Sequence, residues 1–245
     1  MTVLRADVAL LRPVREGNAF EDTVERVLQV IKLGVVGVGD RLPPERELAL
    51  RLGVSRVTLR EAIRALQDAG YVESRRGRYG GTFVLAAPPP PPRPRVRRTT
   101  AQLLSRHGGS TLDDVLTYRR VLEVGAAEVA ATRSLIDSEV RHLHEMLAQT
   151  SVAEPADYRR CDSRLHLAVA ELTGSPLATA AVADARTKVN ELLDSIPLLA
   201  GNIRHSNQQH ERIVSAIVDA DPPRARAAMA EHLDGSSALL RGFLQ

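Results

Sequence analysis

The sequence predicts a mainly α-helical protein of two domains, and three observations support this prediction. Hydrophobic residues repeat with helical spacing along most of the chain, and only two short runs are β-prone. Five consecutive prolines at residues 88–92 interrupt the pattern, and such a run favours an extended, semi-rigid spacer. The charge divides at the same place, because residues 1–98 carry a net +7 and residues 99–245 a net −4.

The composition limits the classes of function. A basic first part and an acidic second part indicate that only the first meets a polyanion. The single cysteine, Cys161, excludes an intramolecular disulfide and a zinc site built on cysteines. No stretch approaches the ~20 apolar residues of a membrane span, and the first residues lack the apolar core of a signal peptide. We therefore expect a cytoplasmic protein with no membrane partner.

The first domain is expected over residues 1–86, with three helices and a small hairpin in a core at 20–85. Pro44 directly precedes the second helix, Gly53 ends it, and Ser55 is a natural N-cap for the third. The expected elements are helices near 20–33, 45–52 and 55–69, and strands near 71–74 and 82–85.

Residues 45–67 have the layout of a helix-turn-helix, because two short helices flank the tight turn at Gly53 and Val54. The second helix of such a motif presents its N-terminal residues to the major groove. Arginine suits guanine, whereas serine and threonine hydroxyls suit phosphates. The outward-facing candidates on this helix are Ser55, Arg56, Thr58, Arg60 and Arg64.

Two further features favour DNA binding. Arg46, near the start of the preceding helix, is placed to contact the DNA backbone or a base. The Arg- and Gly-rich segment at 75–78 between the two strands would form a wing along the minor groove. A stripe of arginines alone is more often a solvated helix face. Here it coincides with a helix-turn-helix, a net +7 and a basic hairpin, so we interpret the first domain as a reader of double-stranded DNA.

The second domain is expected over residues 99–245, after a linker rich in proline and arginine at 87–98. Its hydrophobic pattern is helical throughout, which predicts an antiparallel all-α bundle. Ser175 and Pro176 supply an N-cap and a first helical residue, and the prolines at 222–223 open the last helix. Helices are expected near 101–106, 111–133, 137–150, 156–173, 176–195, 203–220 and 223–242.

Four residues of this domain could converge on a metal ion. Asp162 and His166 are four residues apart and project from one helix face, while His210 and His232 lie on the last two expected helices. Carboxylate and imidazole ligands suit a divalent metal with open coordination positions. Each histidine taken alone is more often a satisfied residue on a packing face. The spacing of the Asp/His pair strengthens the metal interpretation.

The first domain resembles a known family of DNA-binding domains. GDRLPPERELA at 39–49, followed by LGVSRVTLREA at 52–62, looks like the winged helix-turn-helix of the GntR family of bacterial transcription regulators. RGRYGGTFV at 76–84 resembles the wing of that family. The resemblance covers about residues 20–85 and implies that a set of residues reads or anchors operator DNA. These residues are Arg46, Ser55, Arg56, Thr58, Arg60, Arg76 and Gly77.

A second resemblance spans about residues 111–240 and rests on scattered positions. They are RRVLE at 119–123, DSRLH at 162–166, HERI at 210–213 and HL at 232–233. They are similar to the FadR-type C-terminal effector domain (FCD), an all-helical domain that accompanies the GntR reader in one large subfamily.

The FCD resemblance implies a metal and an effector. A divalent metal ion, zinc or nickel, would be held by four ligands, and a small carboxylate effector would complete its coordination. The implied ligands are Asp162, His166, His210 and His232. Arg119 would be the clamp for the anionic effector. The alternative for Arg119 is an ion pair on the helix surface with Glu123, four residues away.

We therefore expect a transcriptional regulator, not an enzyme, that binds a palindromic operator as a homodimer and responds to a small organic acid. Two alternatives stay open. A metal-dependent hydrolase fused to a DNA-binding module would also use an Asp/His₃ site with open positions, although no general base carries a motif. In the other alternative, the metal itself is the signal.

Overall fold

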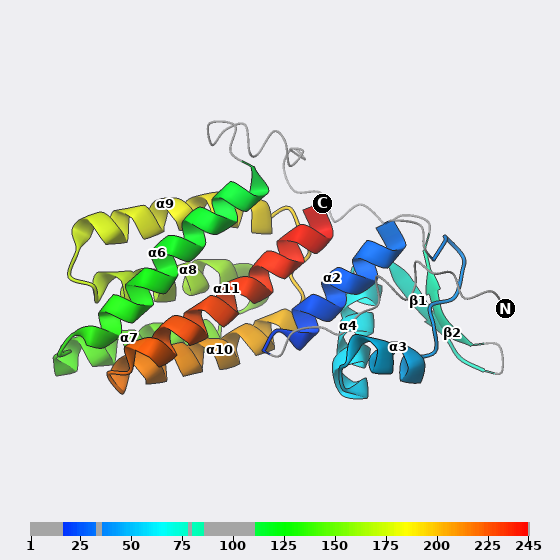
Figure 1. Cartoon of the computed structure of the whole chain (residues 1–245), viewed down its shortest axis with the longest axis horizontal. Helices are drawn as coiled ribbons and strands as arrows, with labels where there is room; N and C mark the ends of the chain where they lie inside the picture. The colour runs from blue at the N-terminus through cyan, green and yellow to red at the C-terminus, as the bar shows by residue number, and fades with distance from the viewer. Residues whose placement is uncertain (1–16, 33–35, 78–79, 86–110, 245) are drawn as a thin grey trace. The chain divides into compact units, whose positions relative to one another are not determined.

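The computed structural model describes residues 17–32, 36–77, 80–85 and 111–244. Within these residues the fold is mainly helical with a two-stranded sheet (Figure 1), which confirms the predicted fold class. The predicted linker and the helix expected near 101–106 lie outside the described residues. Where the structure describes the chain, no helix is long and apolar enough to cross a bilayer.

The chain divides into two compact units. The first unit contains the three helices and the β-hairpin at the start of the described chain, and the second contains most of the helical bundle. Helices α10 and α11 contribute residues to both units. Among the described residues, the first unit comprises 17–32, 36–77, 80–85, 199–202 and 235–244, and the second comprises 111–198 and 203–234.

The first unit has the predicted order of elements. They are α2 (Ala19–Lys32), α3 (Glu45–Leu52), α4 (Arg56–Asp68), β1 (Val72–Arg75) and β2 (Gly81–Val84). The two strands pair antiparallel, with Val72 opposite Val84 and Arg75 opposite Gly81. Helix α2 packs against α4, and the apolar stripes expected from the sequence form the core. Its fully buried members include Val24, Val27, Leu28, Leu59 and Leu66.

The turn between α3 and α4 is built as the sequence predicts. Gly53 has a φ of 65°, in the left-handed region that favours glycine, and so ends α3. Its amide donates to the Leu50 carbonyl oxygen at 3.2 Å, and the amide of Val54 donates to that of Ala49 at 3.0 Å. Ser55 then caps α4, because its Oγ accepts a hydrogen bond from the amide of Thr58 at 3.0 Å.

The bundle is formed by six described helices. They are α6 (Leu112–Thr132), α7 (Asp137–Ser151), α8 (Pro155–Glu171), α9 (Pro176–Leu193), α10 (Ala200–Val218) and α11 (Pro222–Leu244). Helix α6 packs against α8 and α9, and α7 packs against α8. A core cluster takes residues from five helices, among them Val124, Leu143, Leu165, Ile213 and Met229.

Specific caps fix where these helices begin. Thr111 and Asp114 exchange side-chain hydrogen bonds with each other's amides and form a capping box before α6. Ser175 caps α9 and Pro176 follows it, as predicted. Helix α10 begins at Ala200, three residues before the predicted start near 203. The prediction was less exact here because no capping residue or proline directly before this helix marks its beginning in the sequence.

The left-handed residues lead to a prediction about stability. Gly53→Ala places a Cβ in the left-handed region and should lower the free energy of unfolding by about 1–2 kcal/mol. Ala220 lies between α10 and α11 with a φ of 53°. Ala220→Gly should therefore raise the free energy of unfolding by about 0.5 kcal/mol, since the relieved strain exceeds the entropic cost of glycine. Urea unfolding followed by circular dichroism measures both changes, and shifts of the same sign would contradict this account.

Candidate metal centre and DNA interface

Asp162, His166, His210 and His232 lie together inside the second unit, and all four are buried. Each offers one ligand atom, and these atoms all lie within 4.8 Å of one another. Nε2 of His210 is 3.3 Å from Nε2 of His232 and 3.2 Å from Oδ1 of Asp162. Two ligands of a tetrahedral ion with bonds of 2.0–2.1 Å lie about 3.3 Å apart. The four residues therefore have the chemistry and the spacing to hold a divalent metal.

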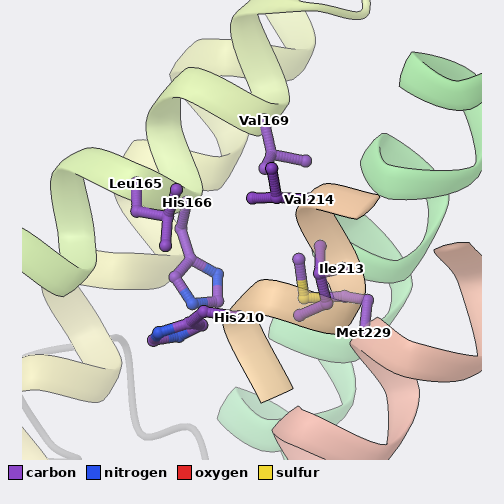
Figure 2. A pocket seen from close by; sticks show the side chains of 7 residues that line it. All are labelled: Leu165, His166, Val169, His210, Ile213, Val214 and Met229. Atoms are coloured by element: carbon purple, nitrogen blue, oxygen red, sulfur yellow. The ribbon is translucent and has the colours of Figure 1, made fainter. Parts of the chain in front are cut away.

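Three helices position the four side chains. Asp162 and His166 stand one turn apart on α8, so Nε2 of His166 lies 3.8 Å from Oδ1 of Asp162. His210 and His232 come from the buried faces of α10 and α11. In Figure 2 the rings of His166 and His210 lie beside each other, next to a group of apolar side chains. The group consists of Leu165, Val169, Ile213, Val214 and Met229.

These apolar side chains shape the electrostatics of the cluster. The space that they line with His166 and His210 is packed too tightly to hold a water molecule. Water is thereby excluded from that side of the cluster, which strengthens electrostatic interactions within it. An organic ligand needs some of these side chains to move before it can enter.

An outer layer of partners orients three of the four candidate ligands, His166, His232 and Asp162. Nδ1 of His166 lies against Oε2 of Glu123, and Nδ1 of His232 is 3.2 Å from Oε1 of Gln209. Such partners are typical of metal-binding histidines, because they fix the ring with its other nitrogen toward the ion. Asp162 is held in the same way, since its Oδ2 accepts from Nη2 of Arg186 and its Oδ1 faces the histidines.

The sequence did not indicate that Glu123, Gln209 or Arg186 belongs to the site. Arg186 could have been found, because it shares a buried stripe of α9 with Val182 and Val189 at helical spacing. An arginine on an apolar stripe needs a buried partner, which is a signal for a polar site. Gln209 has no comparable signal in the sequence.

Arg119 lies next to this cluster and forms the ion pair that the sequence offered as its alternative role. Its Nε donates to Oε1 of Glu123 at 2.9 Å. The pair is buried, however, with side chains 2% and 1% exposed, so its predicted place on the helix surface is wrong. The cause is the packing of α6 against α8 and α9, which covers this face.

The buried groups hold defined charges. Burial by itself would raise the pKa of Glu123, but Arg119 above all, then His166 and Arg186, lower it below its ordinary value. Burial likewise opposes ionisation of Asp162, yet Arg186 is the main group that holds its pKa well below the usual range. Burial lowers the pKa of His166 and His232. The arginines thus favour the ionised form of both carboxylates and burial favours the neutral form of both imidazoles, and these are the forms that bind metals.

The predicted DNA-binding side chains are spread over α3, α4 and the wing. Those of Arg46, Arg56, Arg60 and Arg76 are all exposed. Arg60 is also oriented by α3, since its Nε donates to Oε2 of Glu45 at 2.7 Å. Gly77, which follows β1 by two residues, has a φ of 103°.

Ser55 and Thr58 have a structural role besides the predicted contact with phosphate. The Ser55 side chain is the N-cap of α4, and its Oγ lies 2.8 Å from Oγ1 of Thr58. Both hydroxyls stand at the exposed N-terminus of α4, where backbone amides and the helix dipole also favour an anion. The contact of Ser55 and Thr58 with phosphate stays a prediction.

A winged helix-turn-helix with exposed arginines, joined to a helical bundle with a buried polar cluster, defines a class of protein. It is a DNA-binding regulator with a domain for a ligand. Comparison with known sequence families supports this class. Residues 20–84 match the gntR family of bacterial regulatory proteins, and residues 114–235 match the FCD domain.

Known proteins resemble the chain along most of its length. The helix-turn-helix regulator RmpR of Mycobacterium gastri is 31% identical, covering 91% of this chain and 81% of its own. The transcriptional repressor NanR of Klebsiella aerogenes is 29% identical, and the match covers 95% of this chain and 89% of NanR. A solved GntR structure from Streptococcus agalactiae has 25% identity and a TM-score of 0.46, covering 89% of this chain and 98% of its own.

The chain belongs to the GntR family of bacterial regulators and carries an FCD domain. It is a DNA-binding transcriptional regulator and not an enzyme, so the hydrolase alternative is discarded.

Two neighbouring arginines allow a test of the buried network. Glu123→Ala leaves Arg119 buried without this carboxylate and should lower the free energy of unfolding by about 3–5 kcal/mol. Asp234→Ala removes the partner of Arg120, an exposed pair, and should cost about 0–1 kcal/mol. Urea unfolding in the presence of a chelator measures both, so that metal does not contribute. If both variants lost the same free energy of unfolding, the ion pair between Arg119 and Glu123 would not be a buried one.

Proposed function

We propose that the protein is a homodimeric regulator of the FadR-like subfamily. A small carboxylate, bound at a divalent metal in the FCD domain, sets its affinity for operator DNA. The observation that supports this most is the convergence of Asp162, His166, His210 and His232 in one buried cluster with oriented ligand atoms. Zinc and nickel are the metals that the resemblance to the FCD domain implies, and both accept imidazole ligands.

The metal would supply a Lewis-acidic centre for the carboxylate of the effector. The chain supplies the rest of the site. Glu123 and Gln209 hold two imidazole rings in orientation, and Arg186 holds Asp162. Arg119 is our candidate for a clamp on the effector. The carboxylate of the effector would then replace Glu123 as a partner for part of the Arg119 guanidinium.

The first unit would read the operator. Arg56 and Arg60 on α4 are proposed to reach base edges, with Ser55 and Thr58 on phosphates. Arg46 on α3 and the wing residues Arg76 and Gly77 are proposed as anchors. One such module gives limited affinity, whereas two half-sites that are read together gain avidity, which favours a palindromic operator and a dimer.

A face of α6 is our candidate for the dimer contact. Tyr118, Val121 and Val129 are exposed on one stripe, and Val121 is 68% exposed. Gly125 lies on the same stripe, and a Cβ added there meets no atom within 4 Å. An exposed apolar stripe around a small residue lets two copies of the same helix approach closely in a two-fold contact.

The metal proposal predicts how two variants differ. Wild-type protein should bind about one zinc ion per chain, and His210→Ala should bind none, because a ligand is lost. Arg56→Ala should keep its zinc and bind a duplex selected by the wild type about 10–100-fold more weakly. Elemental analysis and fluorescence anisotropy measure these effects. A wild type without zinc, and unaffected by added zinc, would overturn the metal site.

A thermal-shift screen of organic acids, with and without zinc, tests the effector, since a ligand stabilises the form that it binds. A stabilisation that requires both acid and zinc is expected. The remaining alternative, in which metal alone is the signal, predicts that zinc changes DNA affinity and that no acid adds to its effect.

The dimer predicts a change in mass. Val121→Glu places a charge in the proposed contact and should convert the dimer to a monomer in sedimentation equilibrium at micromolar concentration. Val152, on α7's C-cap, is 81% exposed and outside the stripe, so Val152→Glu should leave the mass unchanged. A dimer that survives Val121→Glu would place the contact elsewhere.

A further inference from the structure

We infer that the effector carries two acidic groups and that Arg186 binds the second of them. This inference rests on the metal site proposed above. It concerns a residue that the sequence did not single out, and it narrows the effector from carboxylates in general to dianions.

The first argument is the incomplete hydrogen bonding of Arg186. Its guanidinium is buried, with a side chain 2% exposed. Nη2 contacts Asp162 and donates to Oγ of Ser163 at 3.1 Å, so this nitrogen is satisfied. Nη1 lies 4.0 Å from Oε1 of Glu123, beyond hydrogen-bond distance.

Within the described part of the chain, Nε and Nη1 of Arg186 are buried and have no hydrogen-bond partner. Buried donors in native proteins nearly always have a partner, which for a donor that the chain leaves unsatisfied is a water molecule, an ion or a ligand. The two nitrogens provide charged donors for an anion, while Nη2 keeps its hold on Asp162.

The second argument is the charge of the cluster. Two guanidiniums, Arg119 and Arg186, face two carboxylates, Glu123 and Asp162, so these four groups sum to zero. Another cation that interacts with Asp162, Arg159, is balanced by Asp194 at 2.9 Å.

A divalent metal would therefore add an uncompensated charge of +2 to a buried site. Buried charge is costly unless it is paired. A monocarboxylate leaves one positive charge in place, whereas a dicarboxylate removes both. Charge balance and the open donors of Arg186 thus point to the same class of ligand.

The test compares acids that differ only in the second carboxylate. Three matched pairs are malate with 2-hydroxybutyrate, succinate with butyrate, and glutarate with valerate, in which a methyl group replaces the carboxylate. Isothermal titration of the zinc-loaded full-length protein should show at least one diacid binding about 10–100-fold more tightly than its partner. Equal binding within every pair would overturn the inference.

Two variants place the second carboxylate. In the pair of acids that shows the difference, Arg186→Gln should reduce the preference for the diacid over its matched monoacid to within about twofold. Arg186→Lys keeps the charge beside Asp162 but loses the Nε donor, and it should weaken the diacid several-fold while the monoacid changes less than twofold. Arg212→Gln, which breaks an exposed pair with Glu231, should change neither acid. An unchanged preference in Arg186→Lys with bound zinc would contradict the assignment even if Arg186→Gln does not fold.

The zinc content separates this inference from the function on which it rests. A wild type that binds no zinc, or that binds no acid in a zinc-dependent way, would overturn the proposed function. A wild type that binds zinc and both members of each pair equally would overturn the dianion alone.

Discussion

The buried charge network around Asp162 is the constraint on which the second unit depends. It joins α6 through Arg119 and Glu123, α8 through Asp162, and α9 through Arg186. None of these groups could be buried alone, because an unpaired charge in an apolar core is strongly destabilising. The helices must therefore pack so that all four charges meet. The same packing brings His210 and His232 from α10 and α11 to within hydrogen-bond distance of each other.

Most of the fold could be predicted from the sequence because the helix ends carry local chemistry. Ser55, Gly53 and Ser175 each mark a boundary by a hydrogen bond or a backbone angle that involves only neighbouring residues. Where such a mark is missing the prediction was less exact, as at Ala200. Local signals fix where helices begin and end, and hydrophobic periodicity fixes which faces are buried.

The site was harder to predict than the fold, because its members come from distant parts of the chain. The i,i+4 spacing places Asp162 and His166 on one face, but no local rule brings His210 and His232 to them. The family resemblance supplied that step. It did not supply Arg186, whose burial depends on how α9 packs against α6 and α8. Its only local signal is an arginine on an apolar stripe.

The position of the cluster in a packed core has a consequence for regulation. The apolar wall beside His166 and His210 leaves no space for water, so a ligand that enters must separate side chains on different helices. Packed cores respond to such a change by shifting whole elements rather than by gradual deformation. Helix α11 is one such element, because it carries His232 in the second unit while residues 235–244 belong to the first. In the regulation proposed above, occupancy of the candidate metal site would alter DNA affinity by favouring one position of α11 over another. The size of this effect is limited by the difference between the affinities of the ligand for the two positions.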